Sequence, residues 1–260
     1  MNKIEMMEIT SQRILAPRIY ELTLKGEMVQ QMDEPGQFLN LLVPRADLLL
    51  RRPISINHID KAEGTCRIIY RVEGDGTAAF AQMQAGEKLN VMGPLGKGFS
   101  YSQLNTGDVA YIIGGGIGIP PLYELSKQLV AKGIKPIHFL GYASNEVKYY
   151  EEEFRALGET HIATDDGSYG VHGHVGYLFE HASAPADAVF SCGSNGLLRA
   201  VENEFLGKVE HVQLSLEARM ACGMGACYAC VNKLRDDETG FKSVKVCDEG
   251  PVFPAGKLVL

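Results

Sequence analysis

The sequence contains no long hydrophobic run, no strongly basic segment, no internal repeat and no low-complexity tail. Residues 39–43 and 48–50 are apolar but short, and 111–122 is rich in glycine and proline, whereas a membrane-spanning helix needs about 20 apolar residues. With a formal net charge of −7 and no cluster of lysine and arginine, the chain also lacks the basic surface that nucleic-acid binding needs. These absences predict a protein that binds neither membranes nor nucleic acids.

The start of the chain mixes charged and apolar residues and lacks the basic segment and apolar core of a signal peptide. We therefore expect no export. The 260 residues, 45% of them hydrophobic, suffice for two modest domains and a small appendage, each with its own core.

Six cysteines are present, and four of them lie near the carboxyl end: Cys222, Cys227, Cys230 and Cys247. They read C-x4-C-x2-C, followed by a fourth cysteine after sixteen residues. This spacing places three thiolates on one tight loop and is the ligand pattern of a plant-type [2Fe-2S] cluster. Gly223, Gly225 and Ala226 fill the first gap, where a loop wrapped around an inorganic core needs small residues and permissive backbone angles.

Two other interpretations of these cysteines are a structural zinc site and unliganded thiols. Zinc sites built from four cysteines usually show paired C-x2-4-C knuckles, and no second knuckle surrounds Cys247. A disulfide framework is disfavoured, because the chain is too long to need such crosslinks. A cluster held by thiolates in a chain without an export signal predicts a cytoplasmic location. Cys66 lies in a strand-like run and is most simply a core residue.

The first part of the chain consists of short β-type runs separated by glycine and proline. The runs cover residues 14–24, 37–43, 53–57, 66–72 and 88–92, with one helical interruption at 77–83. Short strands at this spacing predict a small antiparallel barrel, to which we assign residues 1–102.

The pattern changes near Leu104, where strands begin to alternate with helices. Strands are predicted at 109–113, 137–140, 161–163, 188–191 and 211–216, and helices at 120–132, 149–157 and 195–205. This alternation predicts a parallel sheet over residues 103–215. The cluster loop and its short strands occupy residues 216–260.

Two constellations in the barrel carry candidate chemistry. One is the run Arg51-Arg52-Pro53-Ile54-Ser55, in which a guanidinium can pair with a diphosphate and a hydroxyl can face a flat ring. The other combines Ile69-Tyr70-Arg71 with Gly76 and Thr77, where a helix opens and offers free N–H groups to an anion. Each alone also fits a solvated strand arginine or an ordinary helix cap. Together and in this order they resemble the flavin-binding barrel of the ferredoxin reductase superfamily, whose Arg-x-x-Ser pattern is met by Arg52 and Ser55.

A glycine-rich turn follows the first strand of the parallel sheet, with glycines at 114, 115, 116 and 118 (Gly114, Gly115, Gly116, Gly118). The fingerprint G-x-G-x-x-G fails at its sixth position, which is Ile119, but glycines before a helix still allow close approach of a diphosphate. A bare strand-to-helix turn is the alternative. The run resembles the superfamily's nicotinamide-domain motif.

Asp165 and Cys192 follow later strands of the same sheet, at the ends where such a site would close. The resemblance implies a packing role for Cys192 beside the flavin and nicotinamide; a buried small hydrophobe is the alternative. No arginine or lysine follows the strand at 137–140 closely enough to grip a 2′-phosphate, which favours NADH over NADPH.

With a flavin barrel, a nicotinamide domain and a cluster segment in this order, the chain resembles the electron-transfer subunits of B-type, NAD-dependent dihydroorotate dehydrogenases. The resemblance implies FAD, one [2Fe-2S] cluster and NAD as co-substrate. It also implies an FMN-containing catalytic partner subunit that oxidises dihydroorotate to orotate, in a heterotetramer of two copies of each chain. Exposed apolar residues near Met224 and Tyr228 are expected to be covered by that partner. The alternatives are an NADH-dependent reductase serving a ferredoxin or another flavoprotein, and a non-catalytic nucleotide-binding module held together by zinc.

Overall fold

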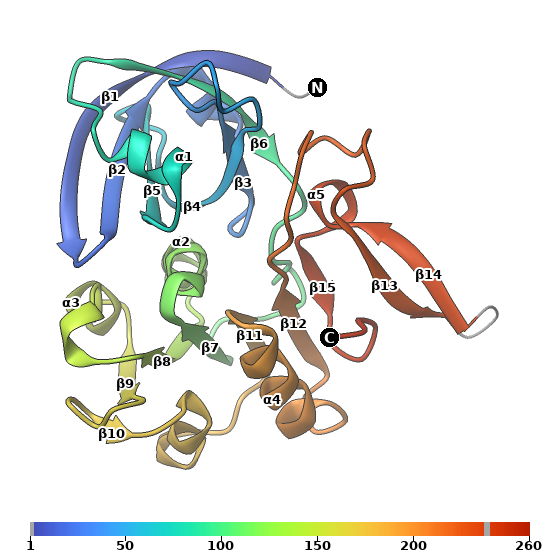
Figure 1. The fold of residues 1–260 in the computed structure, drawn as a ribbon. Coiled ribbons are helices and arrows are strands. Elements are labelled where there is room, and N and C mark those ends of the chain that lie inside the picture. Colours follow the sequence, from blue (N-terminus) through green and yellow to red (C-terminus); the bar gives the residue numbers. More distant parts are fainter. Residues whose placement is uncertain (1–2, 237–239) are drawn as a thin grey trace.

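The computed structural model describes residues 3–236 and 240–260. Within these ranges the chain forms a closed barrel, a mostly parallel sheet and a projecting two-stranded hairpin (Figure 1). The predicted order of an antiparallel barrel followed by a parallel sheet and a small C-terminal unit is confirmed. No helix in these ranges is long and apolar enough to cross a membrane.

The barrel has six strands in the order β1-β2-β5-β4-β3-β6, and every neighbouring pair is antiparallel. Its elements are β1 (Lys3–Ala16), β2 (Ile19–Lys25), η1 (Glu27–Gln31), β3 (Phe38–Leu41), β4 (Arg52–Asp60), β5 (Thr65–Arg71), α1 (Asp75–Phe80) and β6 (Lys88–Leu95). The single run expected at 14–24 is in fact two strands. Pro17 and Arg18 form a tight turn between them, with Arg18 at a φ of 65°, so the chain reverses where the apolar pattern alone looks continuous.

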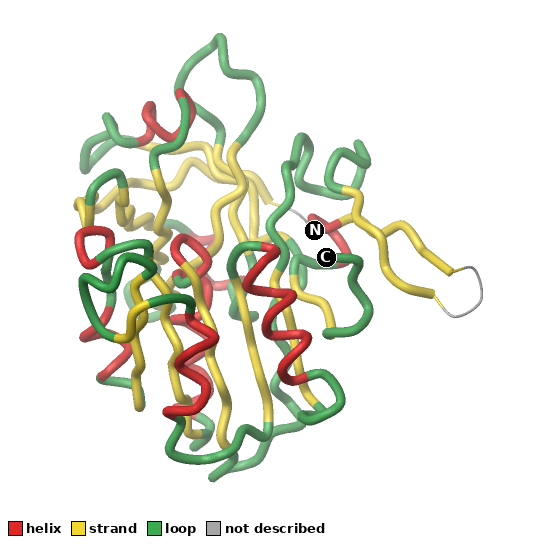
Figure 2. The backbone as a smooth tube through the Cα atoms, turned by 60° about the horizontal axis from the view of Figure 1, so that its bottom comes forward, coloured by secondary structure: helices red, strands yellow, loops and turns green. Residues whose placement is uncertain are grey.

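The central sheet has the order β10-β9-β8-β7-β11-β12-β15. Its elements are β7 (Val109–Gly115), η2 (Gly116–Gly118), α2 (Pro120–Ala131), β8 (Lys135–Tyr142), η3 (Asn145–Val147), α3 (Glu151–Arg155), β9 (Glu159–Thr164), β10 (Val171–His172), η4 (Val175–His181), β11 (Ala188–Cys192), α4 (Asn195–Phe205) and β12 (His211–Ser215). Buried side chains of α2 and α3 pack on one face of the sheet, and those of α4 and η4 pack on the other. This is a doubly wound arrangement, and Figure 2 shows helices alongside its parallel strands.

The C-terminal segment joins both other parts of the molecule. It contains β13 (Val231–Asp236), β14 (Gly240–Lys245), α5 (Val246–Glu249) and β15 (Val252–Pro254). The hairpin of β13 and β14 stands away from the body (Figure 2). β15, in contrast, pairs antiparallel with β12 and completes the central sheet. Val252 and Phe253 of β15 are buried in the hydrophobic cores of the sheet, so this strand of the 216–260 segment packs with the central sheet.

Candidate functional site

Arg52 and Gly76 meet at one edge of the barrel although 24 positions separate them in sequence. A Cβ atom on Gly76 would lie only 2.5 Å from Nε of Arg52, so the guanidinium rests directly on the backbone that opens α1. Arg52 also donates from Nη1 to the carbonyl of Leu50, at 2.7 Å. Pro53, Ile54 and Ser55 follow Arg52 along β4 and are half-buried, which places them where a flat ligand can cover them.

The other predicted barrel residues have different surroundings. The hydroxyl of Thr77 accepts from the N–H groups of Glu73 and Gly74, at 3.0 and 3.3 Å, and so caps α1. Tyr70 is buried in the barrel core, where its ring stacks on Tyr20 with centroids 5.7 Å apart. The side chain of Tyr70 is therefore not available to a ligand.

Ile69 and Arg71 flank Tyr70 on β5. Ile69 is buried in the core shared by the barrel and the face of the sheet that carries α2. Arg71 is exposed and forms an ion pair with Glu73, so its guanidinium lies on the same rim as the start of α1.

The glycine turn brings β7, η2 and β11 into close contact. Cys192 pairs with Gly114 across the parallel strands. A Cβ atom on Gly118 would lie 2.5 Å from the carbonyl oxygen of Cys192, so only glycine allows this approach of the two backbones. Gly116, with a φ of 51°, has no atom within 4 Å of its Cβ position, and its carbonyl accepts from the hydroxyl of Tyr149 at 2.8 Å. The glycine turn is thus packed tightly against Cys192 at Gly118 and has free space beside Gly116.

This turn lies where the sheet changes direction. From β7 the chain adds β8, β9 and β10 on one side, and then returns to add β11 and β12 on the other. Ligands of open α/β sheets bind in the crevice at the carboxyl ends of such neighbouring strands. Burial of the sulfur raises the pKa of Cys192 to about 12, so this residue is a neutral thiol beside the crevice.

Asp165 follows β9 at the same edge of the sheet but two strands away from the glycine turn. Its side chain is exposed and lies 3.5 Å from Nδ1 of His174. The structure therefore places Gly114, Gly118 and Cys192 together and keeps Asp165 apart from them, two strands along the same edge of the sheet.

The four C-terminal cysteines lie together in two pairs. The N–H of Cys222 donates to Sγ of Cys227 at 3.4 Å, and against the effect of burial the thiol of Cys227 lowers the pKa of Cys222. The N–H of Cys247 donates to Sγ of Cys230, also at 3.4 Å, and burial together with the thiol of Cys230 raises the pKa of Cys247. Two pairs of thiols suit a cluster of two irons, each of which takes two protein sulfurs. No three histidine, cysteine, aspartate or glutamate side chains of the described ranges converge as for a single ion.

The loop around the sulfurs also has the features that such a cluster requires. The N–H of Gly225 donates to Sγ of Cys247 at 3.1 Å, and the N–H of Met224 donates to Sγ of Cys222 at 3.4 Å. Gly223 and Gly225 adopt φ values of 70° and 81°, which favour glycine. Burial of the sulfur opposes ionisation of Cys222, but the hydrogen bonds from Met224 and its neighbours outweigh it and lower the pKa to about 6. The residues present thus fit a [2Fe-2S] cluster.

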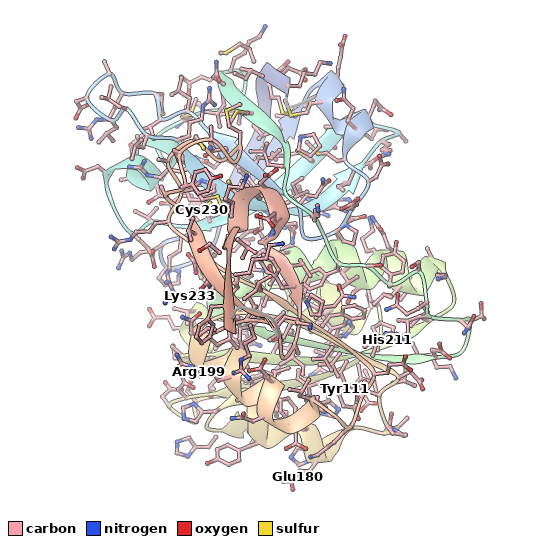
Figure 3. The ribbon with its side chains drawn as sticks, turned by 90° about the vertical axis from the view of Figure 1, so that its right-hand side faces the viewer. Tyr111, Glu180, Arg199, His211, Cys230 and Lys233 are labelled. Atoms are coloured by element: carbon pink, nitrogen blue, oxygen red, sulfur yellow. The ribbon has the colours of Figure 1, made fainter. Side chains whose placement is uncertain are left out.

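The cluster segment packs against the outside of the barrel. Cys230, Cys247 and Val246 share a hydrophobic core with Phe38 of β3 and Met92 of β6. Figure 3 views this side of the molecule and shows Cys230 closer to the barrel than Lys233. The structure also reveals a polar contact that the sequence did not indicate: Nδ2 of Asn40, on β3, donates to the carbonyl of Cys222 at 3.2 Å.

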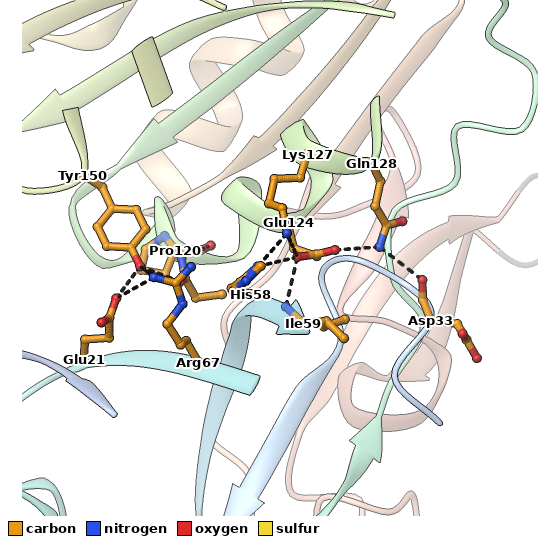
Figure 4. Close-up of polar contacts among 11 residues, drawn as sticks. Glu21, Asp33, His58, Ile59, Arg67, Pro120, Glu124, Lys127, Gln128 and Tyr150 are labelled. Atoms are coloured by element: carbon orange, nitrogen blue, oxygen red, sulfur yellow. Dashed lines mark hydrogen bonds and ion pairs between the residues drawn. The ribbon is translucent and has the colours of Figure 1, made fainter. Parts of the chain in front are cut away.

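A second polar network, also absent from the sequence predictions, joins the barrel to α2 (Figure 4). The carboxylate of Glu124 accepts from the N–H of Ile59 at 3.0 Å and contacts Nδ1 of His58 at 3.1 Å. Asn57 donates to the carbonyl of Pro120 at 3.1 Å. These bonds fix the barrel rim relative to the helix that follows the glycine turn, and therefore fix the two candidate binding regions relative to each other.

Comparisons with known proteins agree with this geometry. Residues 7–101 match the model of the oxidoreductase FAD-binding domain, and residues 217–259 match that of the iron-sulfur cluster binding domain of dihydroorotate dehydrogenase B. The chain is 62% identical over 261 residues to the electron transfer subunit of dihydroorotate dehydrogenase B (NAD(+)) of Enterococcus faecalis strain V583, and covers 99% of each chain. It is 51% identical to the subunit of the same name from Bacillus caldolyticus, over 98% of each chain.

Solved structures resemble the fold at lower identity. The NADH-dependent reduced ferredoxin-NADP oxidoreductase, a flavin-based electron bifurcation enzyme, superposes with a TM-score of 0.84 at 22% identity, covering 98% of this chain and 90% of that chain. Phthalate dioxygenase reductase superposes with a TM-score of 0.65 at 19% identity, covering 94% of each chain. The fold is therefore that of the ferredoxin reductases.

Proposed function

This chain belongs to the family of electron transfer subunits of dihydroorotate dehydrogenase B (NAD(+)), and on that premise we propose how its three parts act. It is an oxidoreductase subunit with an FAD-binding domain and an iron-sulfur domain. We propose that electrons enter from the FMN of a catalytic partner chain, pass through the [2Fe-2S] cluster and FAD, and leave on NAD. When bound, the flavin exchanges single electrons with the cluster and electron pairs with NAD.

The barrel residues are proposed to hold the FAD. The guanidinium of Arg52, resting on Gly76, pairs with the diphosphate, because a planar fork of N–H donors matches two phosphate oxygens. The half-buried β4 segment that ends at Ser55 lies along the ring system. Ile69 and Tyr70 are proposed to contribute by forming the barrel wall beside the FAD. Arg71 and the backbone at Thr77 are proposed to line the rim of the same site.

The glycine turn is proposed to hold the diphosphate of NAD. Gly116 offers an open backbone, Gly114, Gly115 and Gly118 allow close packing, and α2 begins directly beyond them with its positive dipole end toward the crevice. Cys192 contributes a neutral thiol that packs beside the reacting rings and needs no role as acid or base. The exposed carboxylate of Asp165 disfavours a 2′-phosphate and therefore favours NAD over NADP.

The four cysteines are proposed as the cluster ligands, Cys222 with Cys227 on one iron and Cys230 with Cys247 on the other. Met224 and Tyr228 beside them are 48% and 64% exposed. We propose that the FMN-containing catalytic subunit covers them, in a cytoplasmic heterotetramer of two copies of each chain. The paired thiols that pack against the barrel wall support this proposal, since a one-electron carrier held there would lie between the flavin segment and an exposed apolar surface.

The test is reconstitution with and without the catalytic subunit. Dihydroorotate-dependent reduction of NAD is expected only when both chains are present. The isolated chain is expected to contain two irons and two sulfides together with one FAD, because four cysteine ligands hold one [2Fe-2S] cluster. A chain that reduces a ferredoxin with NADH but supports no dihydroorotate oxidation with the partner would establish the alternative reductase function. Colourless material free of iron would refute both.

A further inference from the structure

Asn40 is a polar residue in an unusual position on the barrel wall. On β3, Leu39 and Leu41 point into the barrel core, whereas Phe38 and Asn40 point outward. An outward residue of a barrel normally meets water. Asn40 is instead 1% exposed, because the cluster loop lies over it.

The contact between Asn40 and the loop is close and specific. Nδ2 of Asn40 donates to the carbonyl of Cys222 at 3.2 Å. A Cβ atom on Gly223 would lie 2.4 Å from the same Nδ2, so the left-handed glycine is what lets the loop approach this side chain. The other amide atom, Oδ1 of Asn40, is buried without a hydrogen-bond partner among the described residues. The amide of Asn40 therefore serves as a hydrogen-bond donor to the carbonyl of Cys222.

The backbone of Asn40 is held in turn from the flavin side. Asn40 pairs with Pro53 of β4, the residue next to Arg52. Its carbonyl accepts from Nη1 of Arg51 at 3.0 Å, while Nη2 of Arg51 reaches Oδ1 of Asn90 on β6 at 2.6 Å. Asn40 thus lies between the proposed FAD segment and the first cluster ligand, with fixed contacts to both.

We propose that Asn40 is a positioning residue for the cluster. Asn40 holds the carbonyl of Cys222 and so sets the orientation of the loop whose N–H groups hydrogen-bond to the sulfurs. This inference rests on the proposed function. The peptide after Cys222 leads to Met224, whose N–H donates to Sγ of Cys222. Hydrogen bonds to cluster sulfurs stabilise the more negative, reduced state. Without the anchor at Asn40 the loop turns away, this bond weakens, and the reduction potential of the cluster falls.

The experiment compares two variants of the full chain, purified anaerobically with FAD. Asn40→Leu keeps the approximate shape and removes the donor together with the unpartnered oxygen. Asn40→Ala also removes the donor and the unpartnered oxygen without adding a charge, and it serves if the first variant fails to fold. The readouts are the midpoint potential and the EPR g-values of the reduced cluster, the FAD potential, and iron and sulfide per chain. We expect a shift of the cluster reduction equilibrium by up to about tenfold, or about 59 mV for one electron, toward the oxidised state, with altered g-values and an unchanged FAD potential.

A cluster that is lost from a chain that still binds FAD also supports the inference, because outer contacts of metal ligands contribute about 10–100-fold in affinity. Asn57→Leu is the matched control: Asn57 is equally buried and also donates to a carbonyl, that of Pro120, but it lies in the interface with α2. Its cluster spectrum is expected to equal that of the wild type.

One result overturns the inference: a loaded cluster with wild-type potential and g-values in both variants, or in the one variant that folds. Failure of the proposed function gives a different result. In that case the wild-type chain itself lacks iron and sulfide, or fails to support dihydroorotate oxidation with the partner, whatever residue stands at position 40.

Discussion

Replacing Glu124 is expected to loosen the barrel from the central sheet. This carboxylate is 5% exposed, accepts hydrogen bonds from the N–H of Ile59 and from Gln128, both at 3.0 Å, and contacts Nδ1 of His58 at 3.1 Å. Lys127 lies 3.7 Å away. Figure 4 shows that these partners come from both the barrel and α2, so this one side chain joins the two parts at several points.

The size of the effect follows from the groups left behind. Glu124→Ala leaves the buried N–H of Ile59 without a partner and removes the acceptor of two side chains. Breaking a buried charged network of this kind costs about 3–5 kcal/mol of unfolding free energy. Glu124→Gln keeps the shape and one acceptor oxygen, and should cost about 1–2 kcal/mol. At about 2–4 °C per kcal/mol, the alanine variant should melt about 6–20 °C below the wild type.

The same contact predicts how stability depends on pH. Burial raises the pKa of Glu124, but the hydrogen bonds from His58, Gln128 and Ile59 and the charge of Lys127 outweigh burial, so the pKa lies below its ordinary value of 4.5. A carboxyl whose pKa is lowered by folding stabilises the protein fully above the unfolded value, and this stabilisation is lost as pH falls through the folded value. Below about pH 5 the wild type should therefore lose more stability than Glu124→Gln does.

Thermal unfolding of the FAD-loaded chains at about pH 7 and about pH 4 measures both effects. Glu63→Gln is the matched control, since Glu63 is exposed and its loss removes the same charge. The reasoning is refuted if Glu124→Ala melts within about 1 °C of this control, or if Glu124→Gln retains the full acid sensitivity of the wild type.

Four further predictions concern the proposed cofactor sites. Cys227→Ser should abolish electron transfer to the partner while NADH oxidation by artificial two-electron acceptors continues; unimpaired dihydroorotate turnover would contradict the order of carriers. Arg52→Ala should weaken FAD binding about 10–100-fold, since it removes a charge-assisted hydrogen bond of about 1.5–3 kcal/mol, and titration of the apoprotein with FAD measures it. Gly118→Ala should raise KM for NADH and destabilise the chain by about 1–3 kcal/mol, because the new Cβ would lie 2.5 Å from the carbonyl of Cys192; an unchanged KM argues against a nucleotide at this turn. Cys192 is half-buried, and the desolvation of its sulfur raises its pKa to about 12, so it should react only slowly with iodoacetamide at about pH 8 in mass spectrometry; rapid labelling would contradict a neutral thiol.

The elements that the sequence predicts well are those with local signals. The alternation of apolar strands and helices after Leu104 gives the parallel sheet, and the spacing of the cysteines gives the cluster loop, because both patterns lie within short windows of sequence. The turn at Pro17 and Arg18 was missed because the residues on both sides are β-formers, and one positive φ reverses the chain. The sequence does not show which face of β5 carries the side chain of Tyr70, because a strand pattern alone leaves the choice of face to the neighbouring strands; in the structure this side chain faces the barrel core.

The polar residues between the parts could not be predicted, for a different reason. Asn40 meets a partner 182 positions away, and Glu124 meets one 65 positions away. A polar residue in an outward strand position, or on a helix, is usually solvated, and only the packing of one part on another turns it into a buried contact. The information that identifies such residues lies in long-range contacts, which no short motif contains.

The way the cluster segment is attached suggests why one chain carries all three parts. On the side of Cys222, the loop is held to the barrel by Asn40. Just beyond Cys247, the carbonyl of Gly250 accepts from the N–H of Lys97, which follows the barrel, at 2.7 Å, and β15 then pairs with β12 of the sheet. Both ends of the cysteine set are thus fastened to parts that are themselves joined through Glu124. Because electron transfer needs constant separations between carriers, we expect binding of the partner to bury the surface at Met224 and Tyr228 without moving the cysteines relative to the barrel.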